Sequence, residues 1–162
     1  MIKIRHIQPD EIPVAKELIY RVAHQVFHDT RPLEESIAFY EGQDLLQDID
    51  DFQPMYFDND GVFLVMTDDD RMIGMGAVRK IDDEICELKR VWFLFEYHGK
   101  GLGYRMMQEL LSFAREKGYS RMRLETEPEY QKRAFDFYKR LGFYEIPRYS
   151  NHEGETAMEM VL

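Results

Sequence analysis

Cysteine is almost absent from this chain: Cys86 is the only one among 162 residues, so no disulfide can form within it. We expect this thiol to be a small buried group. No apolar run approaches the roughly 20 residues of a membrane-spanning helix, and the N-terminal stretch MIKIRHIQPDE lacks the apolar core of a signal peptide. These absences predict a cytoplasmic protein that does not associate with membranes.

Positive charge is also scarce, with 21 Lys and Arg against 31 Asp and Glu and a net charge of −10. Such a balance disfavours nucleic acid as a partner. The excess is uneven, because residues 1–70 hold 16 acidic and 5 basic side chains, whereas residues 71–162 hold 15 and 16. The first segment therefore suits a cationic partner or a solvated acidic surface, and the second tolerates an anionic ligand.

Apolar residues are plentiful at 44%, which is enough for one core in a single domain over residues 1–162. Apolar alternation predicts strands at 2–7, 62–67, 72–81, 85–95, 121–126, 143–146 and 157–162. Helical spacing predicts helices near 10–27, 33–42, 102–117 and 131–141, and the acidic segment 43–60 is expected to be a loop or a loosely held helix. This order indicates a mixed α/β fold of the α+β type.

Glycines mark specific positions in this pattern. Gly74 and Gly76 interrupt the strand at 72–81 and predict a bulge or a close backbone approach. Gly118 ends the helix before it as a left-handed cap, and Gly142 closes the helix that follows.

The stretch HGKGLG, residues 98–103, lies between a strand and a helix. The first amides of a helix have no partner within it, and the helix dipole places partial positive charge there. Glycines let an anion reach those amides, and Lys100, Arg105 and His98 add positive charge. The stretch therefore predicts a diphosphate site, although a tight turn before a core helix is the simpler alternative.

The spacing of these glycines separates them from two other phosphate motifs. A dinucleotide fold uses G-x-G-x-x-G after the first strand of a βαβ unit, whereas this pattern is G-x-G-x-G after a fourth strand. A P-loop places Ser or Thr after its lysine, and here Lys100 is followed by glycine.

Two motifs together resemble the GCN5-related N-acetyltransferase (GNAT) superfamily. His98, Gly101 and Gly103 occupy the places of its [RQ]-x-x-G-x-[GA] motif, and AFDFYKRLGF at 134–143 matches A-x-x-x-Y-x-x-x-G-F. The resemblance implies a mostly antiparallel mixed sheet of six to seven strands flanked by about four helices, with the fourth and fifth strands splayed. Three positions depart from the family pattern: His98 replaces Arg or Gln, Phe95 a common proline, and Gln131 a common Asn.

The resemblance also implies acetyl-CoA as co-substrate. In the family, pantetheine fills the gap between the splayed strands; here the backbone of Phe93 and Leu94 would pair with it. An amide near Val91 or Phe93 would polarise the acetyl oxygen, and the pyrophosphate would lie on the loop amides. The implied coenzyme-binding residues are Val91, Phe93, Leu94, His98, Gly99, Lys100, Gly101, Leu102, Gly103, Tyr104 and Gln131.

Two residues are candidates for catalysis. Tyr138 occupies the position of the family's general-acid tyrosine, where it would protonate the leaving sulfur. Glu87 occupies a strand position where some members place a base, and strict alternation would put it on one face with Val91 and Phe93, with Arg90 and Trp92 on the other. The alternatives are a packing role for Tyr138 and a cross-strand pair of Glu87 with Lys89 or Arg79.

The expected activity is therefore acetyl transfer from acetyl-CoA to a primary amine, carried by a small molecule or a peptide. The acid excess of residues 1–70 favours a cationic acceptor, since the first two helices form the acceptor wall in this family. No carboxylate pattern completes a metal site with His24 and His28, so we expect no metal. A longer acyl-CoA, a non-catalytic CoA-binding or regulatory domain, and a structural or interaction domain without coenzyme remain the alternatives, and a monomer and a homodimer are equally open.

Overall fold

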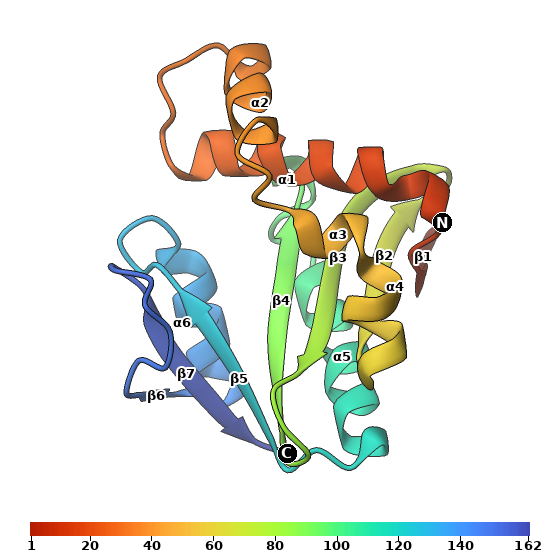
Figure 1. Cartoon of the computed structure of the whole chain (residues 1–162), viewed down its shortest axis with the longest axis vertical. Coiled ribbons are helices and arrows are strands. Elements are labelled where there is room, and N and C mark those ends of the chain that lie inside the picture. The colour runs from red at the N-terminus through yellow and green to blue at the C-terminus, as the bar shows by residue number, and fades with distance from the viewer.

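The computed structural model describes residues 1–162 and contains one seven-stranded sheet with the order β1-β2-β3-β4-β5-β7-β6 (Figure 1). All neighbouring strands are antiparallel except β4 and β5, which are parallel. The sheet confirms the predicted mixed, mostly antiparallel class. The strands are β1 (Ile2–His6), β2 (Val62–Asp68), β3 (Arg71–Lys80), β4 (Ile85–Phe93), β5 (Arg121–Thr126), β6 (Tyr144–Ile146) and β7 (Thr156–Val161).

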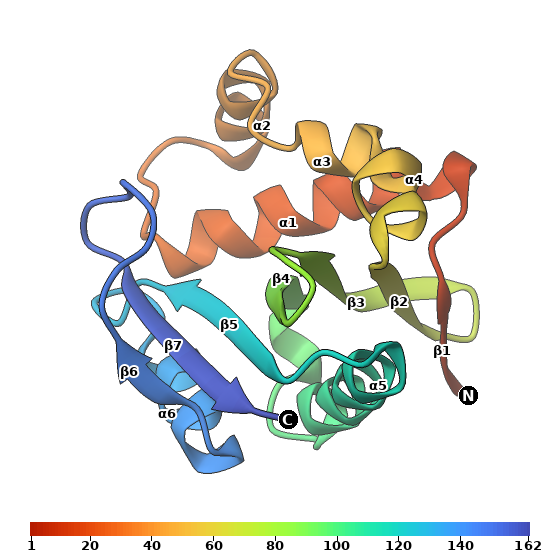
Figure 2. The ribbon, with the colours of Figure 1, turned by 60° about the horizontal axis from the view of Figure 1, so that its bottom comes forward.

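Helices cover both faces of this sheet. Helices α1 to α4 lie on one face, and α5 and α6 lie on the other, as Figure 2 shows. None of them is long and apolar enough to cross a membrane. The helices are α1 (Ile12–Val26), α2 (Leu33–Glu41), α3 (Gln47–Asp50), α4 (Phe52–Met55), α5 (Leu102–Lys117) and α6 (Lys132–Leu141), with 3-10 turns at Pro9–Glu11, Phe57–Asn59 and Phe95–Tyr97.

The acidic segment between α2 and β2 is more ordered than its sequence indicates. It forms the single-turn helices α3 and α4, which raise the helix count to six from the predicted four. Ile49, Phe52 and Tyr56 are each no more than 5% exposed, so the segment is fastened to the core by three large side chains. These anchors are spaced i, i+3 and i+7, which is a helical period that the surrounding acidic residues obscure.

The sheet opens between β4 and β5. Only residues 85–87 of β4 pair with residues 121–123 of β5, although both strands continue further. Beyond these pairs the two strands diverge, which is visible in Figure 1. The splayed arrangement expected at these strands is therefore present, and it leaves a fork in the middle of the sheet.

A bulge interrupts β4 just inside this fork. Ala77 of β3 pairs with Lys89 and Met75 pairs with Trp92, so Gly76 alone faces two residues, Arg90 and Val91. A bulge of this kind shifts the side-chain alternation by one position. Strict alternation was therefore the wrong expectation: Glu87 shares its face with Lys89 and Trp92, and Phe93 lies on the opposite face.

The ring of Phe93, at the end of β4, explains why β3 carries a glycine at position 74. A Cβ at this position would lie 2.3 Å from two ring carbons of Phe93, a distance that no real side chain tolerates. The close approach predicted for Gly74 is confirmed, whereas the bulge opposite Gly76 lies in β4 and not in the strand that carries the glycine. Strand β4 ends at Phe93, two residues earlier than predicted, because the chain forms a 3-10 turn at Phe95–Tyr97 on its way to α5.

Candidate functional site

A cleft of about 600 Å³ passes through the fork from one face of the sheet to the other. Its walls come from α1 on one side and from the β4–α5 loop, α5 and α6 on the other. It is lined by Val22, Gln25, Val26, His28, Val91, Trp92, Phe93, Phe95, Tyr97, His98, Gly99, Gly101, Leu102, Gly103, Tyr104, Tyr130, Gln131, Arg133, Ala134, Phe137, Tyr138 and Arg140.

The glycine stretch forms the end of this cleft nearest α5. Gly99 and Gly101 both have φ of +76°, a left-handed backbone conformation that is sterically unfavourable for residues with a Cβ. None of the backbone amides from Gly99 to Tyr104 donates a hydrogen bond within the protein, and the first helical bond runs from the Arg105 amide to the Gly101 carbonyl. Six successive amides at a helix N-terminus are therefore free to bind an anion.

The charge of the cleft agrees with an anionic ligand. Arg133 and Arg140 line it from α6, and its walls contain no carboxylate. The Arg133 guanidinium lies 3.5 Å from the place that a Cβ of Gly99 would occupy, so it faces the glycine stretch. The sequence analysis missed both arginines, although their i, i+7 spacing on the helix of Tyr138 places them on one face.

Lys100 does not contribute to the cleft wall. Its ammonium lies 5.2 Å from the centroid of the Tyr97 ring, in a cation–π contact on the outer side of the loop. The role predicted for Lys100 in coenzyme binding stays a prediction, and its backbone amide belongs to the six that have no partner.

The β4 side of the cleft contains two of the three residues that were predicted there. Val91 and Phe93 line the cleft, but Leu94 does not. The Leu94 amide donates to the Ile73 carbonyl over 3.0 Å, and its carbonyl accepts from the Tyr97 amide over 2.9 Å. Because both backbone groups of Leu94 already have partners, the predicted pairing of this residue with pantetheine stays a prediction that its position does not favour.

His98 bonds to β4. Its Nε2 lies 2.8 Å from the Phe93 carbonyl oxygen, and its ring centroid lies 4.8 Å from that of Phe95. Since a carbonyl only accepts, Nε2 is the protonated ring nitrogen in this contact. The imidazole therefore links the start of the glycine stretch to the end of β4 by a hydrogen bond.

Gln131 stands at the start of α6 and faces the cleft. Its Oε1 accepts hydrogen bonds from the Thr126 hydroxyl over 3.2 Å and from the Glu127 amide over 3.1 Å. Its Nε2 has no partner within the protein, so one donor remains available to a ligand. The replacement of the family's asparagine thus retains a hydrogen-bond donor here.

Tyr138 combines burial with a free hydroxyl. Tyr138 is 8% exposed, and the centroid of its ring lies 5.7 Å from that of the Phe143 ring. Its hydroxyl makes no hydrogen bond within the protein. Burial raises the pKa of the Tyr138 phenol above its ordinary value, so the hydroxyl stays protonated at neutral pH. A protonated, unpartnered hydroxyl in the cleft is what a general acid requires.

Glu87 lies outside the cleft and is 4% exposed. One carboxylate oxygen accepts from Arg79 over 2.6 Å, and the other accepts from the Tyr149 hydroxyl, also over 2.6 Å. Burial and this carboxylate raise the pKa of Tyr149. The cross-strand pair with Arg79 is therefore confirmed, while a catalytic role for Glu87 stays a prediction that its position does not favour.

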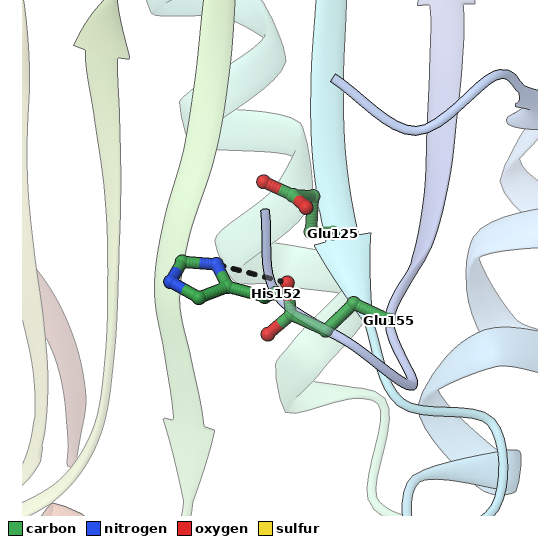
Figure 3. Close-up of side chains that lie close together, drawn as sticks. All are labelled: Glu125, His152 and Glu155. Atoms are coloured by element: carbon green, nitrogen blue, oxygen red, sulfur yellow. Dashed lines mark ion pairs between the residues drawn. The ribbon is translucent and has the colours of Figure 1, made fainter. Parts of the chain in front are cut away.

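Three side chains gather beside the fork, on the loop between β6 and β7 and at the end of β5 (Figure 3). Glu125, His152 and Glu155 each place a ligand atom within 4.8 Å of the others, and His152 Nδ1 lies 3.5 Å from a Glu155 oxygen. Burial and the neighbouring Glu125 raise the pKa of Glu155. These three side chains carry atoms of the types that bind metal ions, and the expectation of no metal stays a prediction.

Two further expectations concern single residues. Cys86 is fully buried, as predicted, and burial raises the pKa of its thiol to about 12. His24 and His28 do not act as a pair, because His24 Nε2 bonds to the Arg31 carbonyl at 2.6 Å while His28 lines the cleft.

Sequence comparison places this chain among known acetyltransferases. Residues 15–143 match the model of the Acetyltransferase (GNAT) family. The chain is 30% identical over 101 residues to the uncharacterized N-acetyltransferase YjgM of Escherichia coli K12, an alignment that covers 60% of this chain and 60% of that protein. The chain thus spans less than two thirds of the length of this curated relative.

Solved structures share the fold over nearly the whole chain. An acetyltransferase from Streptococcus agalactiae 2603 is 23% identical with a TM-score of 0.83 over 99% of this chain and 98% of that one. The PaiA N-acetyltransferase from Thermoplasma acidophilum, solved in complex with coenzyme A, is 22% identical with a TM-score of 0.79 over 100% and 99%. With the family model matched across both sequence motifs, this chain belongs to the GNAT family of acetyltransferases.

Proposed function

We propose that the protein transfers the acetyl group of acetyl-CoA to a primary amine by direct attack of the amine on the thioester. The observation that carries this proposal is the run of six free amides from Gly99 to Tyr104 at the end of a carboxylate-free cleft. A pyrophosphate fits such a cradle because each amide offers a donor and the α5 dipole favours negative charge. The coenzyme-bound structure of the PaiA relative agrees with this choice of ligand.

The fork supplies the path for the acyl arm. With the pyrophosphate on the loop, the pantetheine chain would extend between β4 and β5 along Phe93 and Val91, because these strands no longer pair there. Backbone groups beside the bulge would polarise the acetyl oxygen. As the C–N bond forms and the C–S bond breaks, Tyr138 would give its proton to the departing sulfur. The proton that the acetylated nitrogen loses would then pass through solvent and restore the phenol.

The acceptor would enter from the opposite face, past α1. Val22, Gln25, Val26 and His28 line that side of the cleft, together with Trp92. No residue in 1–70 places a carboxylate in the cleft wall, and the carboxylates that gather beside the fork are those of Glu125 and Glu155. We therefore propose a cationic amine as acceptor, attacking as its free base after losing a proton to solvent.

A panel of acceptors with acetyl-CoA tests this proposal, with release of free thiol as the readout. A polyamine, an aminoglycoside, lysine, a neutral monoamine and a glutamate-rich peptide would be compared at equal concentration. We expect turnover of one or more cationic amines and little turnover of the acidic peptide. Coenzyme binding without turnover of any acceptor would favour the non-catalytic alternative, and better turnover of the acidic peptide would contradict the cationic acceptor.

The arginine that faces the glycine stretch gives a prediction for coenzyme affinity. Arg133→Ala should raise the Kd for acetyl-CoA about 10- to 150-fold, since a charged hydrogen bond to phosphate is worth roughly 1.5–3 kcal/mol. Calorimetric titration measures this directly. Lys132→Ala is the matched control, because it removes the same charge from the same helix. Lys132 pairs with Asp136 on the exposed side of that helix. Equal Kd values for the two variants would contradict the role of Arg133.

A further inference from the structure

The β4 bulge holds a strained residue directly before the cleft. Arg90 has φ of +59°, in the left-handed region that favours glycine, and Val91 after it lines the cleft. A bulge leaves backbone groups outside the ladder and re-aims them, which is why bulges are frequent beside active sites. An arginine does not adopt this conformation by preference, so other contacts must hold it there.

The contact that holds Arg90 comes from α3. The Arg90 guanidinium donates two hydrogen bonds to Asp48, from Nη2 over 2.7 Å and from Nε over 3.1 Å. The Tyr56 hydroxyl donates to the same carboxylate over 2.6 Å. Side-chain exposure is 21% for Arg90 and 10% for Asp48, so the pair is largely shielded from solvent.

The charge state of this pair favours a permanent clamp. Burial pushes the pKa of Asp48 upward, but the Arg90 hydrogen bonds and charge, with the Tyr56 hydroxyl, outweigh it and hold that pKa below its usual value. Asp48 is therefore ionised at neutral pH, as Arg90 is, and the two hydrogen bonds between them join opposite charges.

The other face of the bulge is fixed as well. A Cβ on Gly76, which faces Arg90 and Val91, would lie 2.8 Å from a Leu110 methyl carbon and 3.1 Å from Met106 Cγ. Helix α5 thus packs directly on the backbone opposite the bulge. With α3 holding the Arg90 side chain and α5 packed on Gly76, the backbone of Val91 is fixed from both faces of the sheet.

We propose that Asp48 and Arg90 are positioning residues, whose ion pair holds the β4 bulge so that the backbone at Val91 faces the acetyl group. This inference rests on the proposed acetyl transfer. It assigns a part in the reaction to Asp48, which lies in the acidic segment between α2 and β2 and does not line the cleft. The pair acts through the backbone and touches neither substrate.

Three variants separate this role from plain stability. Asp48→Asn weakens the clamp, and we expect kcat to fall about 10- to 100-fold, since a misplaced donor costs that much, with little change in KM for acetyl-CoA. In the Asp48→Asn background, no buried carboxylate is left unpaired when Arg90 is also replaced. Arg90→Ala then removes the ion pair but keeps a Cβ, which disfavours the positive φ at position 90. Arg90→Gly also removes the ion pair, but glycine adopts a positive φ readily.

The inference predicts that the glycine double variant recovers kcat to within about threefold of wild type, while the alanine double variant stays low. Circular dichroism at the assay temperature confirms that each variant is folded. Equal kcat for the glycine and alanine double variants, or wild-type kcat in a folded Asp48→Asn protein, would overturn the positioning role. A wild-type protein that turns over no acceptor in the same assay would instead overturn the proposed function.

Discussion

Replacing Tyr138 by phenylalanine should lower kcat about 100-fold or more, because the leaving thiolate loses its proton donor. The KM for acetyl-CoA should stay within about threefold, since the ring that packs on Phe143 is retained and only the hydroxyl is lost. Burial raises the pKa of Tyr138, and a general acid works only while protonated, so the wild-type rate should not fall through loss of this proton below about pH 10.

A second buried tyrosine provides the control. Tyr119 is 7% exposed and its hydroxyl donates to the Asp60 carbonyl over 2.8 Å, away from the cleft. Tyr119→Phe removes the same atom and should cost some stability without changing kcat. Steady-state thiol release from both variants decides the matter: wild-type kcat in Tyr138→Phe would contradict the general-acid role.

Replacing Gly74 by alanine should destabilise the fold by about 3 kcal/mol, because overpacking of a fixed core costs that much at its upper end. The new methyl group would lie 2.3 Å from two ring carbons of Phe93, which is 8% exposed, so the ring would have to leave its packed position. For a chain of this size the melting temperature should fall by about 6–12 °C. Acetyl-CoA binding should weaken as well, since Phe93 lines the cleft.

A compensating substitution tests the cause of this effect. Adding Phe93→Leu to Gly74→Ala removes the ring that the methyl group strikes, and it should restore a large part of the lost melting temperature. Gly42→Ala is the control, because Gly42 has φ of −65° and its nearest atom to a new Cβ lies at 3.4 Å. Thermal unfolding followed by circular dichroism gives all four values, and an unchanged melting temperature in Gly74→Ala would refute the close approach.

Local signals made much of this fold predictable. The strand at Arg121–Thr126 has the predicted bounds because its apolar and polar residues alternate without interruption. Gly118 and Gly142 end their helices with φ of +93° and +111°, as glycines after an apolar helical stripe indicate. The glycine stretch before α5 was equally local, because the strand, turn and helix that form it are continuous in the chain.

The parts that escaped prediction depend on distant residues. Arg90 in the bulge is hydrogen-bonded to Asp48, 42 positions earlier, and no residue near Glu87 indicates the bulge. Strict alternation therefore placed Glu87 on the wrong face. The pairing of Glu87 with Tyr149 spans 62 positions, so nothing near Glu87 indicates that both of its oxygens are occupied. Leu94 likewise gives its amide to Ile73 of a strand on the other side of a turn.

The most direct test of the account is whether the free amides of the glycine stretch bind the coenzyme. Protein labelled with ¹⁵N-glycine has ten glycine amides, and acetyl-CoA would be titrated into it while their signals are followed. We expect large, saturable shifts for Gly99, Gly101 and Gly103, with Gly42 and Gly118, which ends α5 far from the stretch, unmoved. Signals of the three loop glycines that stay in place at saturating acetyl-CoA would contradict it.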